Sequence, residues 1–320
     1  MGRGRSTGPL ICILCLILTA TSITAEAAEA PGQTAIPSDL QTARKRITPI
    51  PVFRPTAGLD RHDPSNVIAH DGRFWVFYTH NRGDHREVAV HAGSSADGLT
   101  WEDHGLVVGR GAAGSWDESG AIAPFCVQHA GRFYLFYTGF RDGDLASRDL
   151  GLAIADHPRG PWRRWEGNPV LCRSPAPEAW DSGMLGDSNV VFHNDRWWLF
   201  FKSRRHDQGP RDTRIGVATA DRITGPYLKH PDNPLFAGHA FSLWRHHHGL
   251  AALCGEVSPA ILWSSDGLRF HPVGEFPNSS SGLYTPDSAA DPERRHGFDW
   301  GLDVVSEGGS RGLVRFDCER

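Results

Sequence analysis

The chain has no excess of positive charge and no long stretch without glycine or proline. Its 33 Lys and Arg residues are outnumbered by 37 Asp and Glu residues, so the net charge is −4. This excludes nucleic acid as a main partner, because phosphate binding requires a basic surface. The 36 Gly and 22 Pro residues interrupt the sequence throughout and exclude a bundle of long helices. The chain also lacks a Gly-rich phosphate loop and a Gly-x-Ser-x-Gly elbow.

Cysteines are few and widely spaced once the first thirty residues are set aside. The remaining four, Cys126, Cys172, Cys254 and Cys318, show no Cys-x-x-Cys pair, which argues against a disulfide scaffold. One disulfide stays open as an alternative to simple packing. Residues 246–248 are three consecutive histidines on an expected turn, where they cannot all face one ion. The sequence therefore predicts no metal and no other cofactor.

The first thirty residues have the pattern of a secretory signal peptide. Arg3 and Arg5 precede an apolar run over residues 10–18, and small residues with Ala-x-Ala spacing follow at residues 25–30. The run is short for a permanent anchor, although an uncleaved anchor is the alternative. We expect residues 1–30 to be removed and the mature protein to be secreted or periplasmic, without further membrane contact.

Three segments are near copies of one another. They read Ala-His-Asp-Gly-Arg-Phe-Trp-Val-Phe-Tyr at 69–78, Gln-His-Ala-Gly-Arg-Phe-Tyr-Leu-Phe-Tyr at 128–137 and Phe-His-Asn-Asp-Arg-Trp-Trp-Leu-Phe-Phe at 192–201. Each is typical of a strand, a tight turn and a second, aromatic strand. A weaker copy covers 243–253, and a third and a short fourth strand are expected after each hairpin. Four strands per repeat are typical of a propeller blade.

The length of the repeated region predicts an all-β fold, a five-bladed β-propeller over residues 60–320. The 270 residues from Ile47 to Phe316 leave room for five blades of about 54 to 60 residues. The fifth blade has no visible copy; we infer it from residues 284–316, with a strand from the N-terminal side as a candidate for closing it. Residues 31–59 form a Pro-rich N-terminal extension, in which residues 39–46 are either a short helix or a wrapping tail.

The innermost strand of each propeller blade begins near the central axis, so residues at these starts converge. Titratable residues stand at four of the five expected starts: Asp63, Asp187, His239 and Asp287. A packed core has no use for such a ring, since buried unpaired carboxylates are costly; the alternative is that these residues cap turns. Two carboxylates that face one cavity suit glycoside hydrolysis.

The residue types at this ring also suggest roles. Asp63 is the candidate general base, and Asp187 either acts directly or tunes the pKa of a neighbour. His239 is the candidate proton donor, because a nearby carboxylate can raise the pKa of an imidazole. Further candidates for substrate binding, each with core packing, turn formation or solvation as the alternative, are Asn66, Trp116, Lys202, Tyr284, Asp287 and Trp300.

Several short motifs occur in a characteristic order: His-Asp-Pro-Ser-Asn-Val-Ile at 62–68, Val-Gly-Arg-Gly at 108–111, Gly-His at 238–239, Thr-Pro-Asp at 285–287 and Trp-Gly-Leu at 300–302. In this order they resemble the five-bladed propeller glycosidases around glycoside hydrolase families 43 and 32. The chain looks most like family 117, whose members release 3,6-anhydro-L-galactose from neoagaro-oligosaccharides. The resemblance implies Asp63 as base, Asp187 as the second aspartate, His239 as acid, and inversion at the anomeric carbon.

The chain departs from the family 117 pattern at three polar positions, where it has Phe125, Ala240 and Gly186. These are substrate-contact positions, so the sugar can differ. A partial match at residues 41–46 to a motif linked to swapped dimers leaves a homodimer open. We expect a secreted, inverting, exo-acting glycoside hydrolase with an oligosaccharide substrate. The alternatives are a family 43-like arabinosidase or xylosidase, a non-catalytic carbohydrate-binding propeller and a phosphorolytic propeller enzyme.

Overall fold

The computed structural model describes residues 1, 36–37, 40, 44–82, 88–141, 147–254, 260–276, 282–286 and 298–319. The expected signal peptide, apart from Met1, lies outside these residues. So does Asp287, a candidate for substrate binding. The chain divides into residues 1–33 and residues 34–320, and the fold below is that of the second part. Its described residues contain strands and two short 3-10 helices, η1 (Pro51–Phe53) and η2 (Pro210–Asp212). None of the helices in these ranges has the length and hydrophobicity needed to cross a membrane.

The strands form five blades, and the first three follow the three copies in the sequence. Blade 1 contains β3 (Ile68–His70), β4 (Arg73–Arg82), β5 (Val88–Ser95) and β6 (Trp101–Val108), with β2 (Leu59–His62) also paired to β4. Blade 2 contains β7 (Gly120–His129), β8 (Arg132–Phe140), β9 (Arg148–Ala155) and β10 (Arg163–Arg164). Blade 3 contains β11 (Met184–His193), β12 (Arg196–Arg204), β13 (Arg214–Ala220) and β14 (Leu228–Lys229), with β15 (Phe236–Ala237) also paired to β13.

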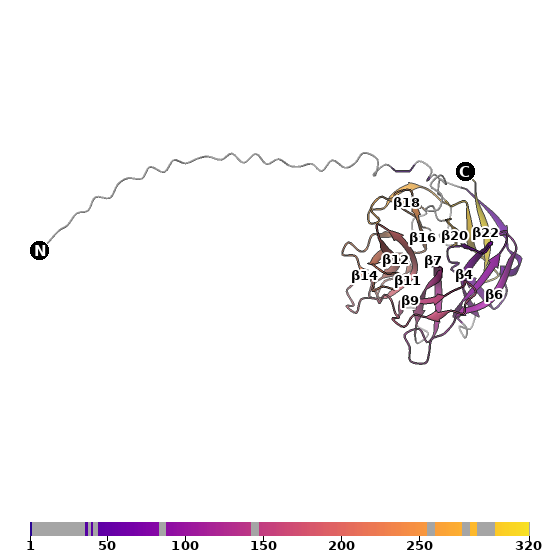
Figure 1. Ribbon diagram of the computed structural model, residues 1–320, viewed down its shortest axis with the longest axis horizontal. Helices are drawn as coiled ribbons and strands as arrows, with labels where there is room; N and C mark the ends of the chain where they lie inside the picture. Colours follow the sequence, from indigo (N-terminus) through magenta and orange to yellow (C-terminus); the bar gives the residue numbers. More distant parts are fainter. Residues whose placement is uncertain are drawn as a thin grey trace. The chain divides into compact units, whose positions relative to one another are not determined.

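The last two blades complete the ring. Blade 4 contains β16 (Phe241–His246), β17 (Gly249–Cys254), β18 (Ala260–Ser264) and β19 (His271–Gly274). Blade 5 contains β20 (Leu283–Tyr284), β21 (Trp300–Glu307), β22 (Ser310–Glu319) and β1 (Arg44–Pro49). Figure 1 shows β7, β11, β16 and β20 near the middle of the domain and β6, β14, β18 and β22 toward its rim. The five-bladed propeller expected from the repeats is confirmed.

The repeated hairpins owe their tight turns to residues that tolerate positive φ. Asp71-Gly72, Ala130-Gly131 and Asn194-Asp195 have positive φ at both turn residues, as a type I′ turn requires. In each hairpin the histidine before the turn pairs with the arginine after it: His70 with Arg73, His129 with Arg132 and His193 with Arg196. The three copies are therefore equivalent in space as well as in sequence.

Blade 5 takes its outermost strand from the N-terminal side of the chain. β1 pairs antiparallel with β22 from Arg44–Glu319 to Pro49–Val314. The helix considered for residues 39–46 is therefore wrong for residues 44–46, since pairing with an open sheet edge satisfies their backbone groups. Phe53, just after β1, is fully buried and packs edge-on against Tyr78 of blade 1, 5.1 Å between ring centroids.

The hydrophobic core consists of layers between neighbouring blades. Each blade is covered on both faces, so its middle strands are buried along their length, as β4 and β8 are. Neighbouring residues of one strand serve opposite layers: Leu199 packs toward blade 2 and Phe200 toward blade 4. Two cysteines are buried in these layers, and all four cysteines considered above are free thiols.

Candidate active site

A pocket open to solvent lies where the innermost strands of all five blades begin. This is the convergence of strand starts expected from the sequence. Asp63 and Asp187 both line the pocket. The complete lining is Asp63, Pro64, Ser65, Asn66, Ala123, Pro124, Phe125, Asp187, Ser188, Asn189, Ala240, Phe241, Ser242 and Gly282.

The same backbone conformation places three of these residues. Asp63, Ala123 and Asp187 have φ of 47°, 49° and 48°, in the left-handed region that non-glycine residues rarely adopt. In blades 2 and 3 this residue lies inside an irregularity of the ladder, between Ile122 and Phe125 and between Gly186 and Asn189. Such bulges re-aim a side chain and occur beside functional sites. Blade 2 has the geometry of blades 1 and 3 but carries an alanine.

Asp63 lies among groups that favour its ionised form. Thr79 Oγ1 donates a hydrogen bond to its Oδ2 at 3.3 Å, and His62 Nε2 lies 3.5 Å from the same oxygen. Burial opposes ionisation, but nearby cationic groups outweigh it and hold the pKa of Asp63 below its usual value; they are His62, Lys202 and Arg311. The side chain is still 40% exposed. Asp63 is therefore an accessible carboxylate at neutral pH.

A chain of charged groups connects Asp63 with blade 5. Arg311 donates two hydrogen bonds to Asp60, at 2.7 and 2.5 Å, and Asp60 Oδ2 lies 3.5 Å from His62 Nδ1. The imidazole of His62 thus lies between the carboxylates of Asp60 and Asp63. The sequence analysis assigned no role to Asp60, His62 or Arg311. The position of His62 next to Asp63 in the sequence could have indicated that His62 belongs to the site. No such signal exists for the contact of Arg311 with Asp60, which spans 251 positions.

Asp187 forms a buried ion pair. Lys202 Nζ lies 2.5 Å from Asp187 Oδ2, and the two side chains are 9% and 19% exposed. Lys202 lies beside Asp187 but is not among the residues that line the pocket. It pairs across the sheet with Gly186, where a Cβ atom would come within 3.4 Å of Lys202 Cε.

His239 stands next to the pocket rather than in its lining; its neighbour Ala240 lines it. His239 Nδ1 lies 3.1 Å from Thr213 Oγ1 and 3.2 Å from the carbonyl oxygen of Pro210. A carbonyl oxygen only accepts hydrogen bonds, so this contact places a proton on Nδ1. Nε2 is then the nitrogen that can exchange a proton.

Two asparagines at the pocket join neighbouring blades. Asn66 donates to the Cys126 carbonyl at 2.9 Å and accepts from the Cys126 N–H at 3.0 Å. Asn189 accepts from the Leu243 N–H at 3.0 Å and donates to the Phe241 carbonyl at 3.3 Å. Asn66 lines the pocket as expected, but its amide is already occupied by this connection.

The three aromatic candidates lie in packed layers and do not line the pocket. Trp116 stacks on Tyr137 with ring centroids 5.7 Å apart, above Gly139 and Gly151, where any side chain would clash with the indole. Trp300 is buried in the layer between blades 5 and 1, with Arg315 4.2 Å from the ring centroid. Tyr284 packs against Trp300 at 5.1 Å. Inter-blade packing accounts for all three.

Comparisons with known proteins agree with this description. Residues 53–169 match the family model of glycosyl hydrolases family 43, a range that contains Asp63. The structure is similar to Zg3597, a family 117 glycoside hydrolase produced by the marine bacterium Zobellia galactanivorans, with a TM-score of 0.75, 22% identity, and 87% of this chain and 90% of that chain covered.

Two further structures share the architecture. Fructan 1-exohydrolase IIa from Cichorium intybus has a TM-score of 0.59 and 12% identity, over 85% of this chain and 57% of that chain. A GH43_1 enzyme from Xanthomonas citri complexed with xylose has a TM-score of 0.50 and 16% identity, over 82% and 89%. No curated protein matches the chain. The comparisons confirm the resemblance in fold to propeller glycosidases of families 117, 43 and 32, and the match to the family model supports a glycosidase.

Proposed function

We propose that the protein is an inverting, exo-acting glycosidase that removes a terminal sugar from an oligosaccharide. The observation that carries the proposal is the presence of Asp63 and Asp187, from blades 1 and 3, in one pocket, with Asp63 ionised and accessible. Inversion requires one group that activates water and another that protonates the leaving oxygen on the opposite side of the bond. A pocket enclosed by five blades suits a chain end rather than the middle of a polysaccharide.

The residues divide the reaction between them. Asp63 takes a proton from the water whose oxygen bonds to the anomeric carbon, while the glycosidic bond breaks. His239 donates a proton from Nε2 to the leaving oxygen, with Nδ1 fixed by the Pro210 carbonyl. Asp187 and Lys202 compensate each other's charge beside the reacting groups. In this scheme Asp187 tunes the site rather than accepting a proton.

The pocket walls suggest the kind of sugar. Phe125 and Ala240, two of the departures from the family 117 pattern, line the pocket together with Pro124 and Phe241. Apolar walls favour a sugar with few free hydroxyl groups, because an unpaired hydroxyl loses its hydrogen bonds to water. A 3,6-anhydro-L-galactose has an ether in place of two hydroxyls and fits this requirement. Terminal arabinose or xylose is the alternative suggested by the family 43 match.

A panel of neoagaro-, arabino- and xylo-oligosaccharides tests the proposal. We expect turnover of one class, release of a single terminal sugar, and a product whose first-formed anomer, followed by NMR, is opposite to that of the substrate. Asp63→Asn should abolish turnover. Asp195→Asn makes the same change in an exposed turn and should not. Retention of configuration, or full activity of Asp63→Asn, would overturn the mechanism.

A non-catalytic carbohydrate-binding propeller is the second candidate. It is favoured by the position of His239 outside the pocket lining and by Phe125, Ala240 and Gly186 at positions that are polar in family 117. Calorimetry with the same panel separates the two functions. Tight binding without turnover by the unmodified protein supports the binding function. Phosphate-dependent turnover reveals a phosphorolytic enzyme instead.

We also propose that the protein acts outside the cytoplasm, after removal of residues 1–30. N-terminal sequencing of the protein recovered from periplasm or medium tests this, and a start at residue 1 contradicts it. The partial motif at residues 41–46 is the reason to propose a homodimer. Sedimentation equilibrium gives the mass that decides it.

A further inference from the structure

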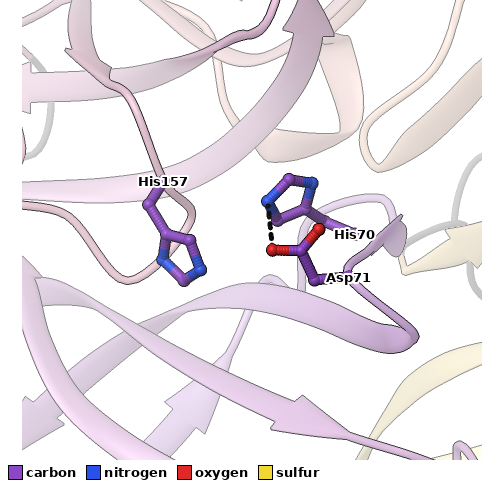
Figure 2. Close-up of side chains that lie close together, drawn as sticks. All are labelled: His70, Asp71 and His157. Atoms are coloured by element: carbon purple, nitrogen blue, oxygen red, sulfur yellow. Dashed lines mark ion pairs between the residues drawn. The ribbon is translucent and has the colours of Figure 1, made fainter.

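Three side chains that bind metal ions well meet between blades 1 and 2, away from the pocket. His70 is the last residue of β3, Asp71 begins the turn to β4, and His157 lies two residues beyond the end of β9. The segment that leads into β3 lines the pocket at residues 63–66, so the end of β3 lies toward the opposite face. Figure 2 shows His70 and Asp71 side by side, with His157 facing them from the other blade.

The distances are close to those of a metal site. One ligand atom from each residue can be chosen so that all three lie within 4.8 Å of one another. His70 Nε2 and Asp71 Oδ2 are 3.2 Å apart. Two ligands of a tetrahedral zinc ion, each about 2.0–2.2 Å from the metal, are separated by roughly 3.3–3.6 Å. One edge of the site is therefore already formed, and the other two need small side-chain movements.

The burial of the residues permits these movements. The side chain of Asp71 is 75% exposed and is free to turn, whereas that of His70 is 21% exposed and packs against Phe133 at 4.9 Å. His157 packs edge-on against Trp75 at 5.4 Å and lies 5.4 Å from the His70 ring. The imidazoles of His70 and His157 are thus held in place by packing, and the exposed carboxylate of Asp71 can turn to provide the third ligand.

The equivalent junction between blades 2 and 3 has the first histidine of this cluster but lacks the other two ligands. His129 packs against Trp197 there at 4.9 Å, as His70 packs against Phe133. A histidine at this position is therefore part of the repeat and needs no metal. The second and third ligands are absent from that junction: the turn begins with Ala130, and Arg222 stands where blade 2 has His157, three residues before the Gly-Pro pair.

We propose that His70, Asp71 and His157 bind one zinc ion, which ties blade 1 to blade 2. Two imidazole nitrogens and one carboxylate oxygen suit zinc and neighbouring first-row divalent ions rather than Ca²⁺ or Mg²⁺, which prefer oxygen ligands. Three protein ligands leave a fourth position for water. The Arg159 N–H donates to His157 Nδ1 at 3.0 Å, and the loss of this bond when Nε2 coordinates makes the affinity moderate.

Isothermal titration of the chelator-treated full chain with ZnCl₂ tests the proposal. We expect one equivalent of zinc with a dissociation constant in the micromolar range, and a rise in Tm of roughly 5 °C at saturation. His157→Arg and Asp71→Ala introduce the residues of the blade 2–3 junction, so both should fold. Each should weaken binding at least tenfold and remove the rise in Tm, while Tm without zinc stays unchanged.

A control variant excludes the other histidine cluster. His247→Asn changes the exposed turn of the run at residues 246–248, where φ is positive and asparagine is tolerated. It should bind zinc like the unmodified chain. No binding by the unmodified chain at 1 mM zinc, or full binding by His157→Arg, would overturn the proposal. So would loss of binding in His247→Asn. None of these outcomes depends on glycosidase activity.

Discussion

Blades 1 and 3 differ from blade 2 at the position that faces the pocket, although the backbone there is the same. Asp63, Ala123 and Asp187 share one left-handed conformation. The residue that precedes each of them pairs with a residue of the next strand. These partners are Thr79 in blade 1, Thr138 in blade 2 and Lys202 in blade 3. In the described part of blade 2, Thr138 Oγ1 is buried and has no hydrogen-bond partner. The repeat thus fixes where a side chain points, and the residue type decides whether the blade takes part in chemistry.

The two aspartates are also unlike each other. Asp63 is 40% exposed and lies beside a hydroxyl and an imidazole, whereas Asp187 is 19% exposed and is paired at 2.5 Å with a buried ammonium group. The Asp187 carboxylate is therefore engaged by Lys202, whereas the Asp63 carboxylate is open to a ligand in the pocket. In the proposed reaction, Asp63 of blade 1 accepts the proton and Asp187 of blade 3 balances charge.

The largest expected effect separates these roles directly. Asp63→Asn should lower kcat by about 10²- to 10⁴-fold, the range of a lost general base. Asp187→Asn, which leaves Lys202 beside the pocket, should cost less. Steady-state kinetics on the best substrate of the panel gives both values. An equal or larger loss in Asp187→Asn would mean that the aspartates have been assigned the wrong way round.

The second prediction concerns replacement of the Asp187 and Lys202 pair of blade 3 by the residue types found at these positions in blade 2. Lys202→Thr leaves the partly exposed Asp187 without its partner and should lower the free energy of unfolding by about 1–3 kcal/mol. Adding Asp187→Ala, which reproduces the pair in blade 2, should restore most of that loss. Urea denaturation of the single and double variants measures the coupling. Additive losses would show that the ion pair is not a coupled unit.

The third prediction concerns the imidazole beside the base. The charge of His62 helps to hold the pKa of Asp63 below its usual value. His62→Gln should therefore raise that pKa and move the acidic limb of kcat/KM to higher pH. Activity depends on ionised Asp63, so it is lost as pH falls through the pKa of this group. His230→Gln, on another blade, should leave the profile in place.

The smallest effect contrasts the same two blades away from the pocket. His80 and His91 stack at 3.8 Å in blade 1, where blade 2 has Gly139 and Gly151 under Trp116. Burial and the neighbouring His80 lower the pKa of His91 to about 4 from 6.5. The unfolded chain thus gains a proton that folded His91 does not, and stability falls as pH decreases from 6.5 toward 4.

Between pH 7 and 6 this change amounts to about 0.7 kcal/mol. His91→Phe keeps a stacked ring and should flatten the dependence of unfolding free energy on pH, followed by denaturation at each pH. His271→Phe, at an exposed position of β19, should not change the slope. An unchanged slope in His91→Phe would assign the pH dependence to other groups.

Features that recur in the repeats could be predicted from the sequence. Contacts between residues far apart in the chain could not. The hairpins, the first four blades and the convergence of Asp63 with Asp187 follow from the spacing of local patterns, whereas the fifth blade was inferred from the length that remained. Asp60 and Arg311 could not be paired in advance, because nothing in 251 intervening positions marks the contact. The aromatic candidates were ambiguous for another reason. Trp116 packs against the sheet because two glycines in neighbouring strands make room for its ring. The presence of a glycine in the sequence does not indicate which side chain packs over it.

The pairing of β1 with β22 has a consequence for how the chain folds. Lys45 bonds Asp303 across 258 positions, so the first strand of the propeller finds its place only after the last blade has been synthesised. Contacts this distant in sequence raise contact order and slow folding. Until β1 pairs with β22, blade 5 presents an open sheet edge, a surface on which chains can aggregate. Aggregation of nascent chains should therefore depend strongly on residues 44–49, even though these residues take no part in the proposed chemistry.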